Sequence, residues 1–419
     1  MLEKLLKNPE VLARHKSAPF AEERERYLAH KSDQKYAEST LIRLASELLL
    51  VSDHFRSYET STEKICVSEV QEAAEKWAAS QCDSGRAQTG KWSGMFFARL
   101  ATDWFRFLGR LQEPVPKPCW YASLLEDYVS FMTHEQNLSR KTIHNRCWHA
   151  EQFLQWYKPR RRGLGISSIQ ITDIDDFLKT CSNRGWSRSS LACSAGALRM
   201  FFRHASMRQW CDSAISQSIQ GPRLFMQIGL PSGPSWKDIE RLIDCMGTES
   251  PSDIRDRAIV LLFAMYGLRS SEVANLRLND IGWQDCRITF TRTKQRRSEV
   301  YPLVPVVGNA LIHYLQAVRQ QSTHREVFLT LKAPFKPLEI QSFYNIVSRR
   351  IVSAEISTTH RGPNSLRHAC ATHLLAEGLS LKEIGDHLGH RKLSTTQVYA
   401  KVDLLNLRKV AQFNFGGVL

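Results

Sequence analysis

Five residues between positions 269 and 399 are of the types that transfer of a phosphodiester requires: Arg269, Lys294, Arg367, His390 and Tyr399. A side-chain hydroxyl can attack phosphorus, positive donors can stabilise charge on the non-bridging oxygens, and an acid can protonate the departing 5′ oxygen. Arginine suits the second task because its planar guanidinium group donates two hydrogen bonds to a phosphate and stays protonated. Their order and spacing suit attack by a tyrosine on a DNA phosphodiester, and no metal is required if guanidinium groups supply the positive charge.

The first arginine follows a segment with the features of a buried helix. Asp253–Tyr266 is largely apolar, and Gly267 can end a helix in the left-handed conformation. Arg269 would then lie in the junction before a second helix, SSEVANL, where Glu272 can orient its guanidinium group. The alternative is that Arg269 and Glu272 form only an intrahelical ion pair.

Glycines and capping residues divide the region around the second arginine into short helices. We expect a helix over Leu366–Glu377 that ends at Gly378. Ser380 and Glu383 form a capping box for a second helix, which Gly389 ends.

The two remaining candidates follow that second helix. His390 is expected to emerge at its end, and Ser394 with Gln397 can cap a helix that carries Tyr399. Successive short helices would bring Arg367, His390 and Tyr399 together. The alternative for Tyr399 is a packing role, because an isolated tyrosine in a helix more often packs in the core or on the surface than acts as a nucleophile.

A β-hairpin is predicted over Arg287–Leu303, where β-rich segments flank a polar turn. Lys294 lies in this turn, from which its ammonium group could reach a minor groove. Arg296 and Arg297 are the other candidates for this catalytic position. The alternative for the whole turn is a run of solvated charges without a catalytic role.

These features resemble the catalytic domain of the tyrosine recombinases, the family of phage-type integrases and chromosome-dimer resolvases. The resemblance is carried by the GLR-x-x-E pattern at Arg269 and by Pro363–Val402, which is similar to the family's H-x-L-R-H, ATHLL, LGH and Y motifs. Motifs in this order are far more specific than one short pattern.

The resemblance implies a role for each candidate. Tyr399 would attack the phosphate to give a 3′-phosphotyrosyl DNA and a free 5′ hydroxyl. Arg269 and Arg367 would stabilise the pentacoordinate state. His390 would donate a hydrogen bond to a phosphate oxygen, and Lys294 would protonate the leaving oxygen.

Asn364 departs from the family pattern, which usually has histidine at this position. An amide can hydrogen-bond a phosphate or a tyrosine hydroxyl, but it cannot accept and return a proton near neutral pH, and loss of a general acid or base typically costs about 10²–10⁴ in rate. Three explanations stay open: a natural variant of reduced activity, an engineered change that traps a DNA complex, or a protein whose cleavage role has passed to a partner. Asn364 also suits the N-cap of the helix expected at Leu366. His360 and His368 are nearby, but neither fits the motif position.

Proline-rich segments divide the 419 residues into three parts. EPVPKPCW and LPSGPSW interrupt any helix, because proline lacks the amide hydrogen and restricts its predecessor. We expect a helical N-terminal extension over 1–115, a helical domain over 118–228 that resembles the SAM-like core-binding domain of the family, and a catalytic domain with a C-terminal tail over 235–419. The expected fold is mainly α, with a small β-hairpin or sheet in the catalytic domain.

An excess of positive charge runs through the chain, with 57 Lys+Arg against 42 Asp+Glu and a formal charge of +15. Such an excess favours a polyanionic partner, although charge alone does not separate DNA from RNA or lipid. In the second part, helices are predicted over Tyr121–His134, Ser139–Tyr157, Thr172–Thr180 and Ser187–His204. The candidate DNA contacts in these helices and in the hairpin are Arg140, Lys141, His144, Arg146, Arg160, Arg161, Arg296 and Arg297. His149, on the same predicted helix as Arg140, could also face phosphates. An ordinary solvated helix face is the alternative.

No cofactor, metal or membrane is expected. The ten cysteines are scattered without a CxxC spacing, and no apolar stretch of about 18 residues occurs. We expect a cytoplasmic, nucleoid-associated bacterial protein. The resemblance implies double-stranded DNA with specific recombination sites as partner, and a homo-oligomer, a synaptic tetramer, or related recombinase subunits.

The leading hypothesis is a site-specific DNA recombinase or integrase that acts in integration, excision or transposition. The N-terminal extension, the GPSW linker and the QFNFGG tail resemble recombinases encoded in adjacent trios on mobile elements. One alternative is a DNA-binding architectural or regulatory protein that has lost cleavage, which would have little reason to keep Tyr399 and both arginines. The other is a type IB topoisomerase, which sequence-independent relaxation of plasmid DNA would distinguish.

Overall fold

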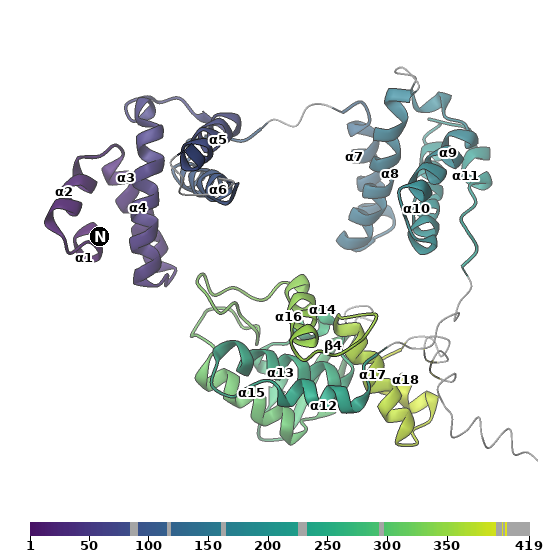
Figure 1. The fold of residues 1–419 in the computed structure, drawn as a ribbon. Helices are drawn as coiled ribbons and strands as arrows, with labels where there is room; N and C mark the ends of the chain where they lie inside the picture. Colours follow the sequence, from purple (N-terminus) through teal and green to yellow (C-terminus); the bar gives the residue numbers. More distant parts are fainter. Residues whose placement is uncertain are drawn as a thin grey trace, which may run out of the picture. The chain divides into compact units, whose positions relative to one another are not determined.

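The computed structural model of this chain consists mainly of helices (Figure 1), and its described residues also form two small sheets. It describes residues 1–83, 91–114, 119–160, 165–224, 233–292, 297–390, 396 and 399. The chain forms two compact units, Val115–Ile228 on the one hand and Met1–Pro114 with Gly229–Leu419 on the other. No helix of the described residues is long and apolar enough to cross a membrane.

The N-terminal segment, residues 1–114, has a hydrophobic core of its own. In α4 (Glu38–His54), Leu41, Leu44 and Leu48 recur about once per turn and are all buried, as expected for an amphipathic helix. Two short strands pair in parallel beside these helices. Its elements are α1 (Leu2–Leu5), α2 (Pro9–Ser17), α3 (Ala21–Asp33), α4 (Glu38–His54), the 3-10 turn η1 (Arg56–Tyr58), β1 (Ile65–Cys66), α5 (Val67–Asp83), α6 (Lys91–Phe107) and β2 (Leu111–Gln112).

The middle segment, residues 119–224, is a helical bundle around buried aromatic side chains such as Phe153, Phe201 and Phe202. All four helices predicted there are present. The first ends earlier than predicted and continues as a π-helical turn, while Ser187 caps the last by accepting a hydrogen bond from the amide of Ser190. The elements are α7 (Ala122–Ser130), η2 (Phe131–Glu135), α8 (Arg140–Arg160), η3 (Ile166–Ser168), α9 (Ile171–Asn183), α10 (Arg188–Met207) and α11 (Ser213–Ser218).

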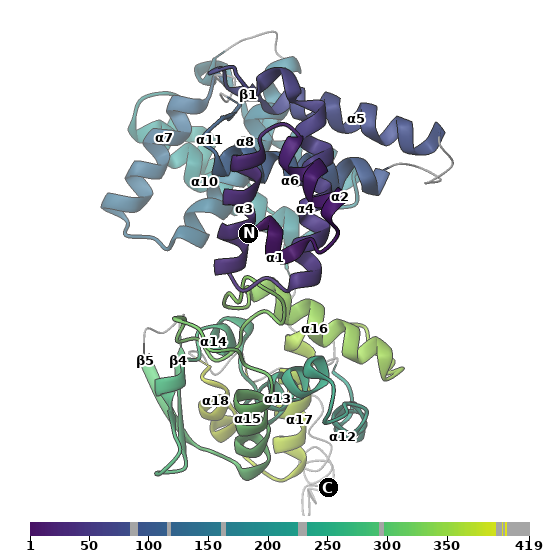
Figure 2. The same ribbon diagram turned by 90° about the vertical axis from the view of Figure 1, so that its left-hand side faces the viewer.

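The C-terminal segment, from residue 233 on, surrounds the buried helix α13 (Pro251–Tyr266), which packs against α15, α16 and α17. Its sheet has the antiparallel order β3-β4-β5, and β4 and β5 lie side by side in Figure 2. The other elements are α12 (Trp236–Asp244), α14 (Ser270–Ala274), η4 (Leu278–Asp280), β3 (Ile281–Gly282), β4 (Arg287–Arg292), β5 (Arg297–Pro302), α15 (Pro305–Ala317), α16 (Ile340–Ser353), α17 (Pro363–Ala376) and α18 (Leu381–Leu388).

The prediction of a mainly α fold with a small hairpin is confirmed, and β3 adds a short third strand to that hairpin. The three-domain division stays a prediction. The three segments have separate hydrophobic cores, but the compact units group the N-terminal segment with the C-terminal one.

Candidate active site

Arg269 lies at a helix junction in which one carboxylate holds both its backbone and its side chain. Gly267 ends α13 in the left-handed conformation at φ 56°, as predicted, and Arg269 is the N-cap residue of α14. The Glu272 carboxylate accepts hydrogen bonds from the Arg269 amide and from Arg269 Nη1, each at 2.8 Å. Arg269 Nη2 also donates to the carbonyl of Gly389 at 3.3 Å. The ion pair is therefore more than a local helix contact, because the same guanidinium reaches the end of α18.

Arg367 projects from α17 into the same junction and is only 6% exposed. It donates hydrogen bonds to the carbonyl of Gly267 and, at 2.8 Å, to that of Leu388. Burial, and then the charge of Arg269, lowers the pKa of Arg367 to about 10. The group stays protonated at neutral pH, so two guanidinium groups tie the end of α13 to the end of α18.

Arg292, which the sequence analysis missed, is a third arginine at this junction and is fully buried. It donates to Glu272 Oε2 at 2.8 Å, to Glu299 Oε2 at 2.8 Å and to the Tyr301 hydroxyl at 2.6 Å. It also donates to the carbonyl of His387 at 3.0 Å. The sequence did contain a sign of this position, because side chains alternate between the two faces of a strand and Arg292 lies on the buried face of β4.

His390 follows α18, which begins with the predicted capping box of Ser380 and Glu383 and ends at the left-handed Gly389. Its Nδ1 lies 2.7 Å from the hydroxyl of Thr396, which is fully buried. Burial, reinforced by the charges of Arg367 and Arg269, lowers the pKa of His390 to about 4. The imidazole is therefore neutral at physiological pH and can donate one hydrogen bond.

Tyr399 is 2% exposed and packs among apolar residues of α17 and α18, including Leu375, Ile384 and Leu388. Its hydroxyl lies 2.8 Å from Nδ1 of His368. Burial raises the pKa of Tyr399 to about 12, although the charge of Arg367 acts in the opposite direction. The sequence analysis set His368 aside as a replacement for Asn364, because it matches the last histidine of the H-x-L-R-H pattern rather than the first.

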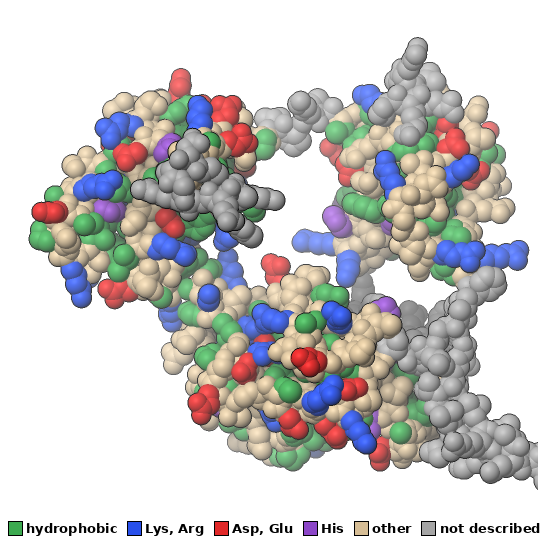
Figure 3. Space-filling model, in the orientation of Figure 1, with side chains coloured by type: hydrophobic (Ala, Val, Ile, Leu, Met, Phe, Trp, Pro, Cys, Tyr) green, Lys and Arg blue, Asp and Glu red, His purple; other side chains and the backbone are tan. Residues whose placement is uncertain are grey.

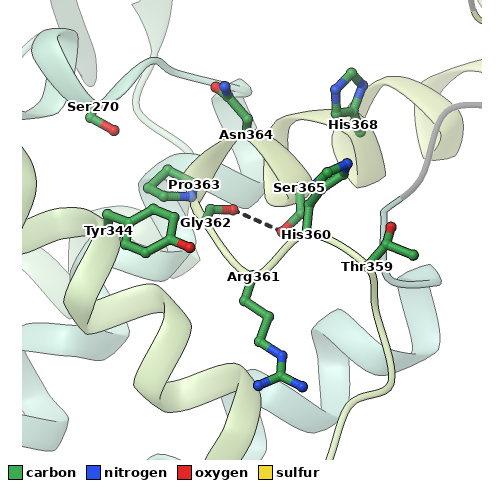
Figure 4. Close-up of a pocket in the computed structure, with 10 residues that line it drawn as sticks. All are labelled: Ser270, Tyr344, Thr359, His360, Arg361, Gly362, Pro363, Asn364, Ser365 and His368. Carbon is green, nitrogen blue, oxygen red and sulfur yellow. Dashed lines mark hydrogen bonds between the residues drawn. The ribbon is translucent and has the colours of Figure 1, made fainter. Parts of the chain in front are cut away.

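A pocket of about 520 Å³ opens beside these groups. Its wall combines the start of α17 with α16 and the loop before α17. Figure 4 shows its lining residues, and the Ser365 hydroxyl donates to the carbonyl of Gly362 at 2.8 Å. The residues that line it are Ser270, Tyr344, Thr359, His360, Arg361, Gly362, Pro363, Asn364, Ser365 and His368.

Asn364 lines this pocket from the first turn of α17, where its side chain is exposed. The prediction that it caps a helix starting at Leu366 is wrong, because α17 begins at Pro363 and its N-cap residue is Gly362. Proline is favoured at the first helical position, where its missing amide hydrogen costs nothing. Asn364 is thus free to face the pocket.

The predicted DNA contacts differ in their surroundings. On α8, Arg140, Lys141 and His144 are exposed, whereas Arg146 is half-buried and donates to Gln136 Oε1 at 3.2 Å. His149 is buried, so the idea that it faces phosphates is wrong: the helix turns it toward the bundle, against Trp186.

The hairpin and linker candidates are only partly described. Arg297 is exposed and pairs with Glu299. Lys294, Arg161 and Arg296 lie outside the described residues, as does the side chain of Arg160. Basic and acidic side chains are interspersed on the face shown in Figure 3, so the case for DNA contact rests on individual helices rather than on one broad patch.

The described residues hold no cluster of three or more histidine, cysteine, aspartate or glutamate side chains suited to a metal ion. What they bring together at the end of α18 is a set of guanidinium groups, a neutral imidazole and a tyrosine hydroxyl. Such groups can stabilise and transfer a phosphoryl group by hydrogen bonding and charge.

Two family models match the chain: the phage integrase family over residues 235–404, and the SAM-like N-terminal domain of phage integrases over residues 125–209. The protein y4rA of Sinorhizobium fredii, named as an integrase/recombinase, is 33% identical over 289 residues, which cover 68% of this chain and 69% of that protein. The tyrosine recombinase XerD of Listeria monocytogenes is 27% identical over 68% of this chain and 96% of its own.

Among solved structures, the XerH site-specific recombinase in a post-cleavage complex with its difH substrate has a TM-score of 0.54 at 17% identity, over 84% of this chain and 98% of that one. The Tn1549 transposon integrase has the same TM-score at 15% identity, over 68% and 99%. These likenesses establish the fold, and the sequence matches establish the family. The chain belongs to the phage integrase family and is a site-specific DNA recombinase of the tyrosine type.

Proposed function

We propose that Tyr399 is the nucleophile with which this recombinase cleaves DNA, and that Arg269, Arg367 and His390 stabilise the phosphate under attack. The observation that carries this proposal is the shared junction at the end of α18. Arg269 and Arg367 donate to the carbonyls of Gly389 and Leu388, and His390 follows directly in the chain.

The two arginines have different surroundings and therefore different proposed tasks. Arg367 is nearly inaccessible, whereas the side chain of Arg269 is 23% exposed. Rigid guanidinium groups that are positioned before the reaction stabilise developing charge without reorganisation. In this account Arg269 meets the phosphate most directly, and Arg367 holds the ends of α13 and α18 together while adding positive potential.

The reaction conserves the energy of the phosphodiester. The Tyr399 oxygen forms a bond to phosphorus while the bond to the 5′ oxygen breaks, and Lys294 is proposed to protonate that oxygen. A 5′ hydroxyl from another strand then reverses the step, which reseals the DNA without ATP.

Double-stranded DNA is the proposed partner. The XerH and Tn1549 integrase structures are complexes with DNA, and the exposed Arg140, Lys141 and His144 of α8 are suited to phosphate contacts. We place specific recombination sites, and a synaptic tetramer of this chain or of related recombinase subunits, within the same proposal. Membership of the mobile-element trios is a further prediction, tested by the genes adjacent to this one.

Asn364 lowers the cleavage rate in this proposal only if no other group accepts the Tyr399 proton. In that case Asn364→His raises the rate by about 10²–10⁴, the usual contribution of a general acid or base. If another group performs the transfer, the substitution has little effect.

The test is a nicked duplex that carries the recombination site, sought in DNA flanking the gene. Cleavage next to the nick releases a short fragment and traps the covalent complex, which a denaturing gel resolves. The proposal predicts an adduct with the natural chain and none with Tyr399→Phe. Site-specific binding without an adduct would point instead to the binding-only alternative.

A further inference from the structure

His368 contacts the proposed nucleophile and the pocket at the same time. Its Nδ1 lies 2.8 Å from the Tyr399 hydroxyl, and the two ring centroids are 5.7 Å apart. The same residue lines the pocket together with Asn364 and His360. An imidazole that touches both a reacting oxygen and an open pocket is placed to move a proton between them.

The two protonation states permit the hydrogen bond that proton transfer requires. The Tyr399 hydroxyl keeps its proton at neutral pH because burial raises its pKa to about 12. Burial, and then the charges of Arg367 and His360, lowers the pKa of His368 below its ordinary value, which favours the neutral imidazole. A neutral imidazole has one nitrogen that accepts and one that donates. In the tautomer with its hydrogen on Nε2, the tyrosine hydroxyl donates and Nδ1 accepts.

Asn364 and His368 are separated by one helical turn. They are four residues apart on α17, a spacing that places side chains on the same face of a helix. Figure 4 shows both side chains leaving the same side of α17. His368, one helical turn after position 364, therefore reaches the same pocket that a histidine at position 364 would reach.

We propose that His368 accepts the Tyr399 proton during DNA cleavage and so performs the transfer that Asn364 cannot. This inference rests on the proposed function of Tyr399. As the tyrosine oxygen bonds to phosphorus, its proton passes to Nδ1 of His368. The bond from phosphorus to the 5′ oxygen breaks, and that oxygen takes a proton from Lys294. Religation reverses both transfers, with the imidazolium returning its proton to the tyrosine oxygen.

The experiment measures single-turnover cleavage of the nicked substrate from pH 5.5 to 9.5. His368→Asn is expected to lower the rate at pH 7 by about 10²–10⁴. Its rate is then expected to rise about tenfold per pH unit between pH 7 and 9, because the tyrosinate fraction rises in that proportion below the pKa of Tyr399. The natural chain is expected to show a flat profile over the same range, since its imidazole is already neutral.

Two further variants test whether the imidazole itself matters. Asn364→His alone is expected to change the rate by less than about tenfold, whereas in the His368→Asn background it restores the rate and the flat profile. With His368→Ala, imidazole added to the buffer is expected to raise the rate. The same addition does nothing for Tyr399→Phe.

His373→Asn is the matched control, because it removes a histidine from the same helix. His373 stacks on Trp236 at a centroid distance of 3.8 Å, away from the proposed chemistry, and its loss is expected to leave the pH profile flat. A His368→Asn chain with the natural rate and pH profile would overturn the inference, while its adduct would leave the role of Tyr399 intact. The absence of an adduct with the natural chain would overturn both.

Discussion

Glu272 Oε2 accepts a hydrogen bond at 2.8 Å from Nη1 of Arg292, a guanidinium that is fully buried. The same carboxylate binds Arg269, so the half-buried Arg269 and the fully buried Arg292 share one anion. Arg292 also reaches the carbonyl of His387 in α18. The positions of Arg269 and of the end of α18 therefore depend on a residue from β4 that has no access to solvent.

Replacing Arg292 with methionine is expected to destabilise the chain by about 3–5 kcal/mol, because the buried carboxylate of Glu272 loses its buried partner and keeps only Arg269, and Glu299 keeps only the exposed Arg297. Urea unfolding measures this change. Arg297→Met is the matched control: Arg297 also pairs with Glu299, but it is 60% exposed, and its loss is expected to cost at most about 1 kcal/mol. Equal effects of the two substitutions would contradict the structural role assigned to Arg292.

Gly389→Ala is expected to reduce both stability and cleavage. Gly389 has φ +63°, and an added Cβ would lie 2.7 Å from Nε of Arg292. Gly378→Ala isolates the backbone contribution, because Gly378 has φ +92° but no heavy atom within 4 Å of an added Cβ. The left-handed conformation alone costs about 1–2 kcal/mol. Thermal unfolding of both variants should show the larger loss for Gly389→Ala, which alone should also impair adduct formation.

Stability is expected to fall as the pH drops from about 6.5 toward 4. Burial lowers the pKa of His390 to about 4 in the folded chain, while an unfolded histidine titrates near 6.5. Between these values the unfolded state binds more protons, so acid favours unfolding. Urea midpoints at pH 7 and pH 5 measure the loss, which His390→Asn should reduce. A pH dependence unchanged by that substitution would show that His390 does not titrate as described.

Arg140→Gln with Lys141→Gln is expected to weaken DNA binding and to reduce the slope of log affinity against log salt by about two, if each side chain contacts one phosphate. The matched control is Lys179→Gln, a neutralised lysine that is exposed on α9. Fluorescence anisotropy at several salt concentrations gives both slopes. Similar small losses of DNA affinity in the α8 variant and in Lys179→Gln would show that Arg140 and Lys141 lie on an ordinary solvated helix face.

Local signals in the sequence were sufficient for much of the site. Gly267, Gly389 and the Ser380–Glu383 capping box act within a few residues, and the structure has the helix ends that they predict. Contacts made across the chain were not accessible in this way. The bond from Arg292 to His387 joins residues 95 positions apart, so residue type and periodicity alone could not reveal it.

The contact between His368 and Tyr399 was missed for a similar reason. A sequence motif identifies residues by their position in the chain, whereas hydrogen bonding depends on where the helices place the side chains. His368 follows Arg367 directly, and the packing of α17 decides which oxygen it meets. The start of α17 was misplaced because Pro363, rather than Asn364, determines where the helix begins.

The most direct test of the central claim is to trap the covalent complex on the nicked substrate, digest both protein and DNA, and locate the nucleotide by mass spectrometry. The account predicts a peptide that carries a nucleotide phosphate on the hydroxyl of Tyr399, with no modified peptide after Tyr399→Phe. A nucleotide attached to any other residue would contradict it.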